Sequence, residues 1–322
     1  MKRIAVMTSG GDAPGMNAAI RAVVRTGLEH DVEVYGVRQA YTGLLSGDFE
    51  LLTSREVSGI LQRGGTILQT ARNEEFKTLQ GQRKALRRLN EYGIEGLVVV
   101  GGDGSLRGAL ALHELDFPVV GVPGSIDNDI WGTDMSIGVD TALNTIIDAL
   151  DRIRDTATSH QRAFLIEVMG RNCGYLALMA GILGGAEIVI TPEKAITMDE
   201  VAAALEDSYV RGKSHAVAVM AEGAAYSITD LANYLMKNKN VGFEIRLSIL
   251  GHMQRGGSPS AFDRRLASML GMRALDVLME GQTGVMVGML GRVIQTVSLE
   301  DVTTKTREMT ESYYELSRIL SR

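Results

Sequence analysis

Short apolar runs alternate with amphipathic segments along most of this chain. The apolar runs predict strands over residues 4–7, 33–37, 97–100, 118–122, 164–168, 187–190 and 215–220. Apolar residues at helical spacing predict helices over 18–29, 80–92, 140–156, 198–211 and 262–280, then a hairpin at 285–297 and a last helix at 312–322. This alternation is typical of βαβ units and a largely parallel sheet. We predict an α/β fold with a second, smaller sheet starting near residue 164.

Composition narrows the class of protein only a little. The chain has 322 residues, which exceeds the usual size of one hydrophobic core, so two domains are expected. With 45% hydrophobic residues, 22% charged residues and a net charge of −6, it resembles an ordinary globular protein and not a nucleic-acid-binding one. Its single cysteine, Cys173, forbids an intrachain disulfide. No apolar stretch is long enough for a signal peptide or a membrane span, so we expect a cytoplasmic protein with no membrane partner.

Two predicted strands end in turns that carry glycines and carboxylates. The first turn is GGDGS at 101–105, and the second is GSIDNDI at 124–130, where Asn128 is expected to serve the turn itself. Strand ends of an open α/β sheet face one pocket, glycines let backbone N–H groups approach phosphate, and carboxylates hold Mg²⁺ or accept a proton. Because an aspartate in a turn often only closes the turn, Asp129 has both a structural and a functional interpretation. The combination favours phosphoryl transfer.

Further candidates for anion binding surround these turns. The segment TSGGDAPGMN at 8–17 joins a strand to a helix N-terminus, which suits an anion, although it matches neither the Walker pattern nor GxGxxG. Tyr41 is expected in a glycine-rich turn, and Arg72 in a loop where charged residues often serve ligands. Guanidinium groups match phosphate oxygens, so the strand-end arginines of the second half are suited to a phosphorylated small molecule: Arg162, Arg171, Arg246 and Arg255.

Seven motifs occur in an order and spacing that resemble the bacterial ATP-dependent 6-phosphofructokinases. They are TSGGDAPGMNAAIRAVVR, RGGTILQTAR, GGDGSLRGA, PGSIDND, SHQRAFLIEVMGR, AEG and LGHMQRGGSPSAFDRRLAS. The resemblance implies two doubly wound three-layer α/β/α domains with mainly parallel sheets and a cleft between them. An ATP-binding domain would comprise 1–138 and 251–301, and a fructose 6-phosphate-binding domain 139–250 and 302–322. It also implies a homotetramer whose active and effector sites lie at subunit interfaces.

The resemblance implies a reaction, the committed step of glycolysis, in which the ATP γ-phosphoryl passes to the 1-hydroxyl of fructose 6-phosphate. Asp127 would be the general base, Arg171 would stabilise the transferred group, and Asp129 would help to position the base. Asp103 would lie on Mg²⁺. The implied ATP-binding residues are Gly11, Tyr41, Arg72, Asn73, Gly102, Asp103, Gly104 and Ser105. The implied substrate-binding residues are Ser125, Ile126, Asp127, Arg162, Met169, Gly170, Arg171, Glu222, Arg246, His252, Met253, Gln254 and Arg255, with Arg162 and Arg246 reaching across an interface.

The family's second site binds ADP as activator or phosphoenolpyruvate as inhibitor. The implied effector residues are Arg21, Arg25, Arg55, Gly59, Arg154, Gly185, Glu187, Arg211, Lys213 and His215. Two of them depart from the family pattern, because Gly59 replaces an aspartate and Arg55 lies one place from the commoner arginine position. For Arg211 a solvated interface edge is the alternative. Trp131 also stands where smaller residues are common.

Two glycines bear on the phosphoryl donor. Pyrophosphate-dependent relatives carry an acid at the position of Gly104 and a lysine at the position of Gly124, so the glycines favour ATP. A pyrophosphate-dependent enzyme is therefore one alternative. A sensor that binds sugar phosphate and nucleotide without turnover is the other, and the retained Asp103, Asp127 and Asp129 argue against it.

Overall fold

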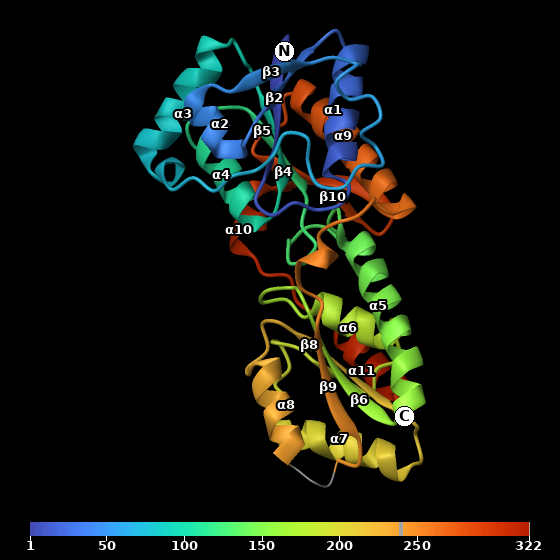
Figure 1. The fold of residues 1–322 in the computed structure, drawn as a ribbon. Helices are drawn as coiled ribbons and strands as arrows, with labels where there is room; N and C mark the ends of the chain where they lie inside the picture. Colours follow the sequence, from blue (N-terminus) through green and yellow to red (C-terminus); the bar gives the residue numbers. More distant parts are fainter. Residues whose placement is uncertain (238–240, 322) are drawn as a thin grey trace. The chain divides into compact units, whose positions relative to one another are not determined.

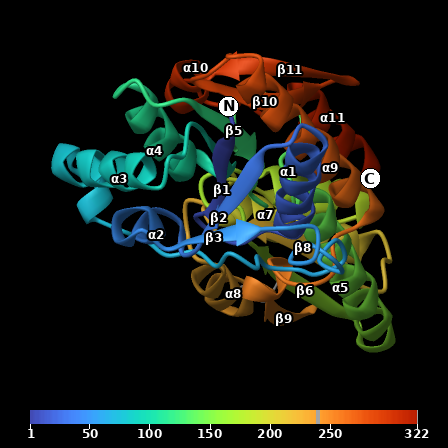
Figure 2. The ribbon, with the colours of Figure 1, turned by 90° about the horizontal axis from the view of Figure 1, so that it is seen from above.

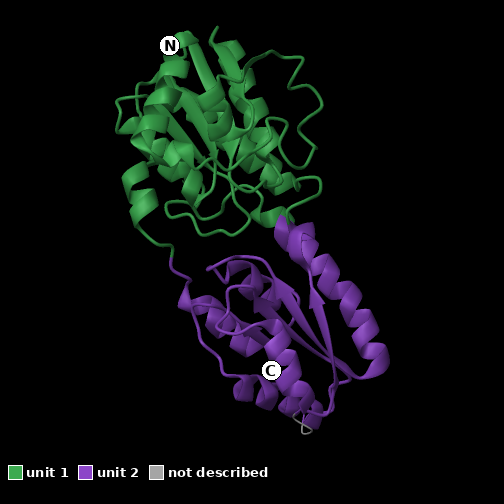
Figure 3. Ribbon diagram, turned by 60° about the vertical axis from the view of Figure 1, so that its left-hand side comes forward, with its two compact units in different colours: residues 1–141, 255–307 green, residues 142–254, 308–322 purple. Residues whose placement is uncertain are grey.

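The computed structural model describes residues 1–237 and 241–321, and the chain divides into two compact units (Figure 3). Unit 1 comprises Met1–Thr141 and Arg255–Arg307, and unit 2 comprises Ala142–Gln254 and the residues from Glu308 onward. The chain therefore passes between units after residues 141, 254 and 307. The sequence led us to expect these changes after residues 138, 250 and 301.

Unit 1 is built on a seven-stranded sheet of order β11-β10-β5-β4-β1-β2-β3 (Figure 1). Its strands are β1 (Arg3–Ser9), β2 (Glu33–Val37), β3 (Phe49–Leu52), β4 (Leu97–Gly101), β5 (Val119–Pro123), β10 (Val285–Leu290) and β11 (Val293–Ser298). The inner strand pairs are parallel, while β3 and β11 add antiparallel pairs at the two edges. The predicted hairpin is confirmed as β10 and β11. Every residue of β4 and β5 is buried, as continuous apolar runs predict for central parallel strands.

Helices cover both faces of this sheet. They are α1 (Met16–Glu29), α2 (Ala40–Ser46), α3 (Leu79–Glu91), α4 (Asp103–His113), α9 (Ala261–Met279) and α10 (Leu299–Thr304), with a 3₁₀ turn η1 at Glu75–Lys77. Figures 1 and 2 show α1 and α9 together on one side of the strands, and α2, α3 and α4 on the other. The apolar stripe of each helix thus packs on the sheet, and unit 1 has three layers.

Unit 2 contains the predicted second, smaller sheet, of order β7-β8-β6-β9, with all of its strand pairs parallel. Its strands are β6 (Arg162–Val168), β7 (Ile188–Ile190), β8 (Ala216–Ala221) and β9 (Glu244–Ile249). Its helices are α5 (Val139–His160), α6 (Tyr175–Leu183), α7 (Met198–Val210), α8 (Ile228–Lys237) and α11 (Glu311–Leu320), with a 3₁₀ turn η2 at Gly251–Gln254. In Figure 1, α5, α6 and α11 lie on one face of the sheet, and α7 and α8 on the other. The predicted α/β class with two three-layer domains is confirmed.

Several local predictions were wrong. Tyr41 lies in helix α2 and not in a glycine-rich turn. Gly43, which suggested the turn, is instead needed for close packing inside the helix, since a Cβ there would lie 1.8 Å from the Arg38 carbonyl oxygen. Helix α6 was not predicted, because it is apolar on all sides and so carries no helical periodicity. The last helix ends at Leu320, and Arg322, which we expected within it, lies outside the described residues. No helix within 1–237 or 241–321 is long and apolar enough to cross a membrane.

Candidate active site and effector site

The carboxyl ends of β1, β4 and β5 bring three glycine-containing turns together in unit 1. Ser9 pairs with Gly101 and Gly101 pairs with Pro123, so the residues that follow each strand are neighbours. A Cβ on Gly10 would lie 3.1 Å from Ser105 Oγ, and a Cβ on Gly102 would lie 3.7 Å from Ser125 Cβ. The predicted nucleotide and base turns therefore adjoin at one edge of the sheet.

The middle turn continues directly into α4, which begins at Asp103. The free N–H groups of a helix start attract anions, and Gly104 leaves this start open, since no atom lies within 4 Å of the position a Cβ would take. The Asp103 side chain is 43% exposed and accepts a hydrogen bond from Arg107 Nε at 3.0 Å. Helix start and carboxylate together suit a phosphate that carries a cation.

Tyr41 contacts the backbone at the start of α4. Its hydroxyl donates to the Ser105 carbonyl oxygen at 2.6 Å, and its ring stacks on Phe76 with centroids 4.0 Å apart. Only 7% of the residue is exposed, and burial raises the pKa of its hydroxyl. Tyr41 thus fixes the backbone of the turn, and its hydroxyl is used within the fold.

The other predicted nucleotide residues, Arg72 and Asn73, follow a segment held against the first turn. Thr70 Oγ1 donates to the Gly10 carbonyl oxygen at 2.8 Å. Arg72 is exposed, whereas Asn73 accepts from Phe76 N at 3.0 Å and donates to Thr42 Oγ1 at 3.2 Å. The structure therefore leaves Arg72 accessible and uses the Asn73 amide locally.

The third turn carries the predicted base. Asp127 is 2% exposed, and its N–H donates to Ser125 Oγ at 3.2 Å. Asn128 has a φ of 55° and its side chain spans the loop, accepting from Ser136 N at 3.0 Å and donating to the Asp134 carbonyl oxygen at 3.3 Å. Asn128 serves the turn, as expected. Ile126 is fully buried, so its side chain belongs to the core.

The donor chemistry fits a cation that arrives with a phosphorylated ligand. Among the residues that the structure describes, no group of three or more His, Cys, Asp or Glu side chains could hold a metal by itself. Mg²⁺ typically takes one or two carboxylates and completes its shell with phosphate oxygens and water. Asp103 and the partly buried Asp129 supply carboxylates of that kind.

Arg255, predicted to bind the sugar phosphate, lies on the first turn of unit 1. Its Nη1 donates to the Asp12 carbonyl oxygen at 3.3 Å. The guanidinium covers Gly11 so closely that a Cβ there would lie 2.4 Å from Nη1. Sequence spacing gave no sign of this contact, because 243 residues separate Arg255 from Asp12.

Unit 2 presents a second constellation after the carboxyl end of β6. Glu222 Oε1 accepts from Gly170 N at 3.3 Å and from Arg171 N at 2.9 Å, and Met169 N donates to Gln254 Oε1 at 3.1 Å. Gly170 and Arg171 have φ values of 142° and 51°, so the turn is held in an unusual conformation. The predicted residues Met169, Gly170, Arg171, Glu222 and Gln254 therefore lie together. The 3₁₀ turn η2 exposes His252 and Met253.

Glu167, which precedes this turn on β6, was not among the predicted site residues. Burial and the nearby Glu222 raise the pKa of its carboxyl. A half-buried acid on a strand with an otherwise apolar pattern is the signal that was available.

Arg162 and Arg246 do not join this constellation. Arg162 Nε donates to Glu244 Oε2 at 2.8 Å, and Arg246 also bonds to Glu244. Arg162 starts β6 and pairs with Glu244, whereas Met169 follows the end of that strand. At about 3.3 Å per residue, some 20 Å of strand separate the two ends. Within one chain, Arg162 and Arg246 therefore lie apart from Arg171.

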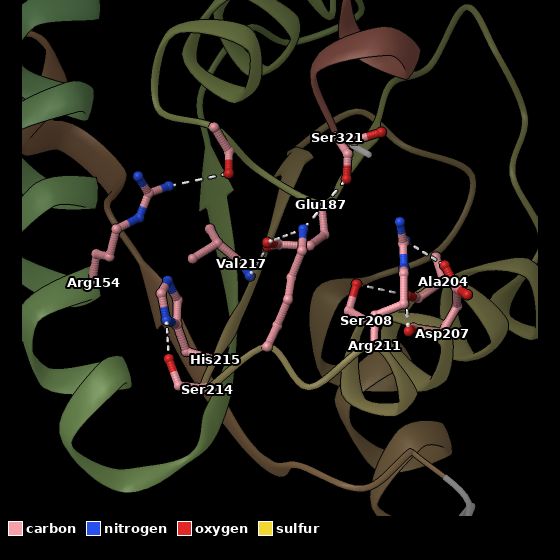
Figure 4. Close-up of polar contacts among 12 residues, drawn as sticks. Arg154, Glu187, Ala204, Asp207, Ser208, Arg211, Ser214, His215, Val217 and Ser321 are labelled. Atoms are coloured by element: carbon pink, nitrogen blue, oxygen red, sulfur yellow. Dashed lines mark hydrogen bonds and ion pairs between the residues drawn. The ribbon is translucent and has the colours of Figure 1, made fainter.

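Most of the predicted effector residues of unit 2 form a compact polar cluster (Figure 4). Glu187 accepts from Lys213 Nζ at 3.1 Å and from Val217 N at 2.6 Å. Arg154 bonds to the carbonyl oxygens of Gly184 and Gly185, the latter at 3.1 Å. His215 Nδ1 lies 3.1 Å from Thr158 Oγ1. Burial lowers the pKa of His215, Glu187 opposes that shift, and Arg154 and Lys213 reinforce it.

Other effector candidates lie apart from that cluster. Arg211 bonds to Asp207 in α7, away from Arg154 and His215 in Figure 4. In unit 1, Arg21 and Arg25 share one face of α1, and Arg25 donates to the Ser54 carbonyl oxygen at 3.3 Å, next to Arg55. Gly59 has a φ of 68°, a conformation that favours glycine.

A cavity of about 480 Å³ borders the cluster of unit 2 and reaches α11. Among its lining residues are Glu187, Lys194, Tyr314, Arg318 and Ser321. Space for a small polar molecule thus exists beside Glu187.

Comparison with known proteins agrees with this geometry. Residues 3–278 match the family model described as Phosphofructokinase. The chain is 54% identical over 321 residues to an ATP-dependent 6-phosphofructokinase of Halalkalibacterium halodurans, and 51% identical over 322 residues to one of Thermotoga neapolitana, with both chains covered completely.

Solved structures show the same fold. The phosphofructokinase of Saccharomyces cerevisiae matches with a TM-score of 0.90 and 38% identity over the whole of this chain and 48% of the yeast chain. A pyrophosphate-dependent phosphofructokinase of Marinobacter aquaeolei matches with a TM-score of 0.86 at 21% identity, covering 99% of this chain and 91% of the other, a likeness of fold alone. From its family match and full-length identity, the chain belongs to the phosphofructokinase family.

Proposed function

We propose that this chain is an ATP-dependent 6-phosphofructokinase, which transfers the γ-phosphoryl group of ATP to the 1-hydroxyl of fructose 6-phosphate. The products are fructose 1,6-bisphosphate and ADP. The observation that carries the proposal is the adjacency of the Gly10–Gly11, Gly102–Ser105 and Ser125–Asp127 turns at the ends of β1, β4 and β5. Full-length relatives named ATP-dependent 6-phosphofructokinase support it. We expect the enzyme to act in the cytoplasm.

In this proposal unit 1 holds the nucleotide. The α4 start, with Gly102, Gly104 and Ser105, offers N–H groups to the phosphates, and the exposed Arg72 offers a guanidinium. The carboxylate assigned to Mg²⁺ is that of Asp103. Asp129, two residues after the proposed base, helps to position that base. When bound, Mg²⁺ neutralises the phosphate charge that develops during transfer.

Asp127 is the general base. Its carboxylate accepts the proton of the 1-hydroxyl as the sugar oxygen bonds to the γ-phosphorus, while the bond from that phosphorus to the β,γ-bridging oxygen breaks and ADP leaves. The buried turn held by Ser125 and Asn128 orients the carboxylate for this step. The Arg171 guanidinium stabilises the charge on the transferred group. Phosphoryl transfer needs positioning and cations more than covalent chemistry, and this residue set supplies both.

Unit 2 binds fructose 6-phosphate through Met169, Gly170, Arg171 and Glu222, with His252 and the neighbouring Met253 and Gln254. Arg162 and Arg246 lie at the opposite end of β6 from these residues, so one chain cannot direct all of them at one sugar phosphate. We therefore assign both arginines to the site of a neighbouring subunit in a homotetramer, where they bind the 6-phosphate.

The polar cluster around Glu187, Lys213 and His215, with Arg154, is the proposed effector site for ADP or phosphoenolpyruvate. Its cations suit a phosphate, and its adjoining cavity suits the rest of a small ligand. Arg21, Arg25, Arg55 and Gly59 complete it in a neighbouring copy of the chain. Gly59 lacks the carboxylate of the usual aspartate, so the strength of control is a property to measure.

The decisive experiment compares the purified wild-type protein with Asp127→Ser. Without the base we expect kcat to fall by about 10²- to 10⁴-fold. Binding of fructose 6-phosphate, measured by calorimetry, should stay within about tenfold, because the base acts mainly in the transition state. Asp134→Ser, an exposed aspartate of the same loop, is the matched control and should keep its turnover. Unchanged turnover in Asp127→Ser would refute the assignment.

The same assay run with Mg-ATP and with Mg-pyrophosphate identifies the donor. Activity with ATP alone agrees with the proposal, since Gly104 leaves open space beside the α4 start. Activity with pyrophosphate alone would assign the pyrophosphate-dependent reaction instead. Absence of activity with either donor, with binding retained, would favour a sensor.

A further inference from the structure

We infer that Asp263 is a positioning residue for phosphoryl transfer, because its buried carboxylate holds the segment that clamps the Ser125–Asp127 turn. This inference rests on the proposed role of Asp127 as the base. Asp263 lies in the first turn of α9 and is fully buried. Its connection to the proposed base runs through the backbone before α5.

The carboxylate of Asp263 caps a helix that belongs to a distant part of the sequence. Oδ1 accepts from Gly138 N at 2.9 Å, while Oδ2 accepts from Thr141 N at 2.8 Å and Thr141 Oγ1 at 2.5 Å. These donors surround the start of α5 at Val139, where backbone N–H groups lack partners within the helix. A residue 122 positions beyond Thr141 thus supplies the cap.

A local cap is excluded at this place. Helix starts usually take a Ser, Thr, Asp or Asn at the residue before the helix, but here that residue is Gly138. Gly138 has a φ of 106°, and a Cβ on it would lie 2.7 Å from Ala13 Cβ. Since a Cβ does not fit there, the residue before α5 offers no side-chain cap, and Asp263 accepts from Gly138 N and Thr141 N instead.

The cap is itself held by a reciprocal network. Ser260 caps α9 by accepting from Asp263 N at 3.2 Å, and its hydroxyl donates to Asp140 Oδ2 at 2.6 Å. Ser260 N donates to Thr141 Oγ1 at 2.9 Å. The first turns of α5 and α9 are therefore bound to each other from both sides, which fixes the direction of the Asp263 carboxylate.

From this cap three hydrogen bonds lead to the turn of the proposed base. Ile137, next to Gly138, donates its N–H to the Pro123 carbonyl oxygen at 3.0 Å and accepts from Ser125 N at 3.1 Å. Ser136 N donates to Asn128 Oδ1 at 3.0 Å. The 136–138 segment thus holds the turn on both sides of Asp127. Without the hydrogen bond from Gly138 N to Asp263, the neighbouring Ile137 would be held less firmly against Pro123 and Ser125.

The first test is Asp263→Asn, which keeps the shape of the side chain. The two carboxylate oxygens accept from Gly138 N and Thr141 N. An amide has one oxygen and one NH₂ group, so its NH₂ would face one of these N–H donors and one hydrogen bond would be lost. We expect kcat at saturating substrates to fall by about tenfold to a hundredfold through misplacement of the base. The KM for fructose 6-phosphate and the Kd for ADP should stay within about threefold, because the binding groups are unchanged.

The matched control is Leu275→Ala, a fully buried position on the same helix that lies outside the network. Both variants are assayed well below their measured Tm, per active tetramer. A merely structural role predicts lowered Tm in both with wild-type kcat in both, and that result would overturn the inference. A loss of kcat confined to Asp263→Asn supports it.

A milder variant keeps the inference testable if Asp263→Asn does not fold. Thr141→Val removes one donor to Asp263 and the acceptor of Ser260 N, and it leaves the bonds from Gly138 N and Thr141 N to the Asp263 carboxylate. We expect kcat to fall by about threefold or more. Wild-type kcat in Thr141→Val would then overturn the inference. Asp127→Ser separates the two proposals: wild-type kcat in Asp263→Asn beside an inactive Asp127→Ser refutes only the positioning role, whereas an active Asp127→Ser refutes the proposed base.

Discussion

The guanidinium of Arg255 covers the backbone of Gly11, with Nη1 located 2.4 Å from where a Cβ on that glycine would stand. The glycine is needed at this position for a close approach and not for its φ, since Gly11 is not among the residues with positive φ. A residue from the proposed sugar-phosphate set thereby rests directly on the first nucleotide turn. This contact joins the proposed sugar-phosphate residues to the proposed nucleotide residues.

We expect Gly11→Ala to displace the Arg255 side chain while leaving the fold intact. The clashing atoms are the tip of a flexible side chain, so the free energy of unfolding should change by less than about 1 kcal/mol. Loss of a charged contact to the sugar phosphate should lower kcat/KM for fructose 6-phosphate by about tenfold to a hundredfold. Steady-state kinetics and thermal unfolding measure both. Gly256→Ala, whose Cβ would meet no atom within 4 Å, is the control and should behave like wild type.

Gly104→Asp tests the donor argument. The open surroundings accept the side chain without a packing penalty, but its negative charge would point to where the nucleotide phosphates are proposed to bind. We expect kcat/KM for ATP to fall by about tenfold or more through charge repulsion, with no change in Tm. Gly104→Ala adds bulk without charge, so its comparison with Gly104→Asp isolates the effect of the charge. An unchanged kcat/KM for ATP in Gly104→Asp would contradict the assignment of the nucleotide phosphates to this helix start.

Mixing inactive subunits tests the assignment of Arg162 to a neighbouring site. Asp127→Ser and Arg162→Ser are each expected to have little activity alone. If Arg162 serves another subunit, hybrids made by coexpression contain intact sites, about a quarter of the total for random pairing. A mixture of Asp127→Ser with Arg171→Ser is the control, because both residues are assigned to one subunit's site and no intact site can form. Equal activity in the two mixtures would contradict the assignment.

The titration of His215 predicts a pH dependence of effector binding. Burial, reinforced by Arg154 and Lys213 and opposed by Glu187, keeps the pKa of His215 below its usual value. His215 is therefore neutral at neutral pH, and an anion bound beside it favours its protonated form. We expect the affinity for phosphoenolpyruvate to rise as the pH falls below neutral, because the bound anion favours proton uptake by His215. Calorimetry at several pH values measures this rise.

The control for that series is His215→Asn, which cannot take up the proton. The remaining pH dependence in this variant belongs to the ligand and to the other groups of the cluster. If wild type and variant show the same slope, His215 does not couple proton uptake to binding.

Much of the architecture follows from the sequence because its determinants are local. The apolar runs at β4 and β5 are buried at every residue. Gly102 and Asp103 follow β4 directly, and Gly124 follows β5 with Asp127 three residues later. Helices with one apolar face, such as α1, lie where the periodicity predicts them. The family could also be recognised from the sequence, because each motif is a contiguous stretch that can be identified without the tertiary structure. Where local pattern is absent, as in the uniformly apolar α6, prediction failed.

The tertiary structure alone decided which distant groups meet. Strand register places Ser9, Gly101 and Pro123 side by side, a pairing that no single segment encodes. The separation of Arg162 from Arg171 likewise depends on which end of β6 each residue occupies. The cap on α5 comes from Asp263, across 122 residues, because packing at Gly138 leaves no room for a local one. Turn chemistry and periodicity act over a few residues, whereas contacts between strand ends and helix starts are set by how the whole unit packs.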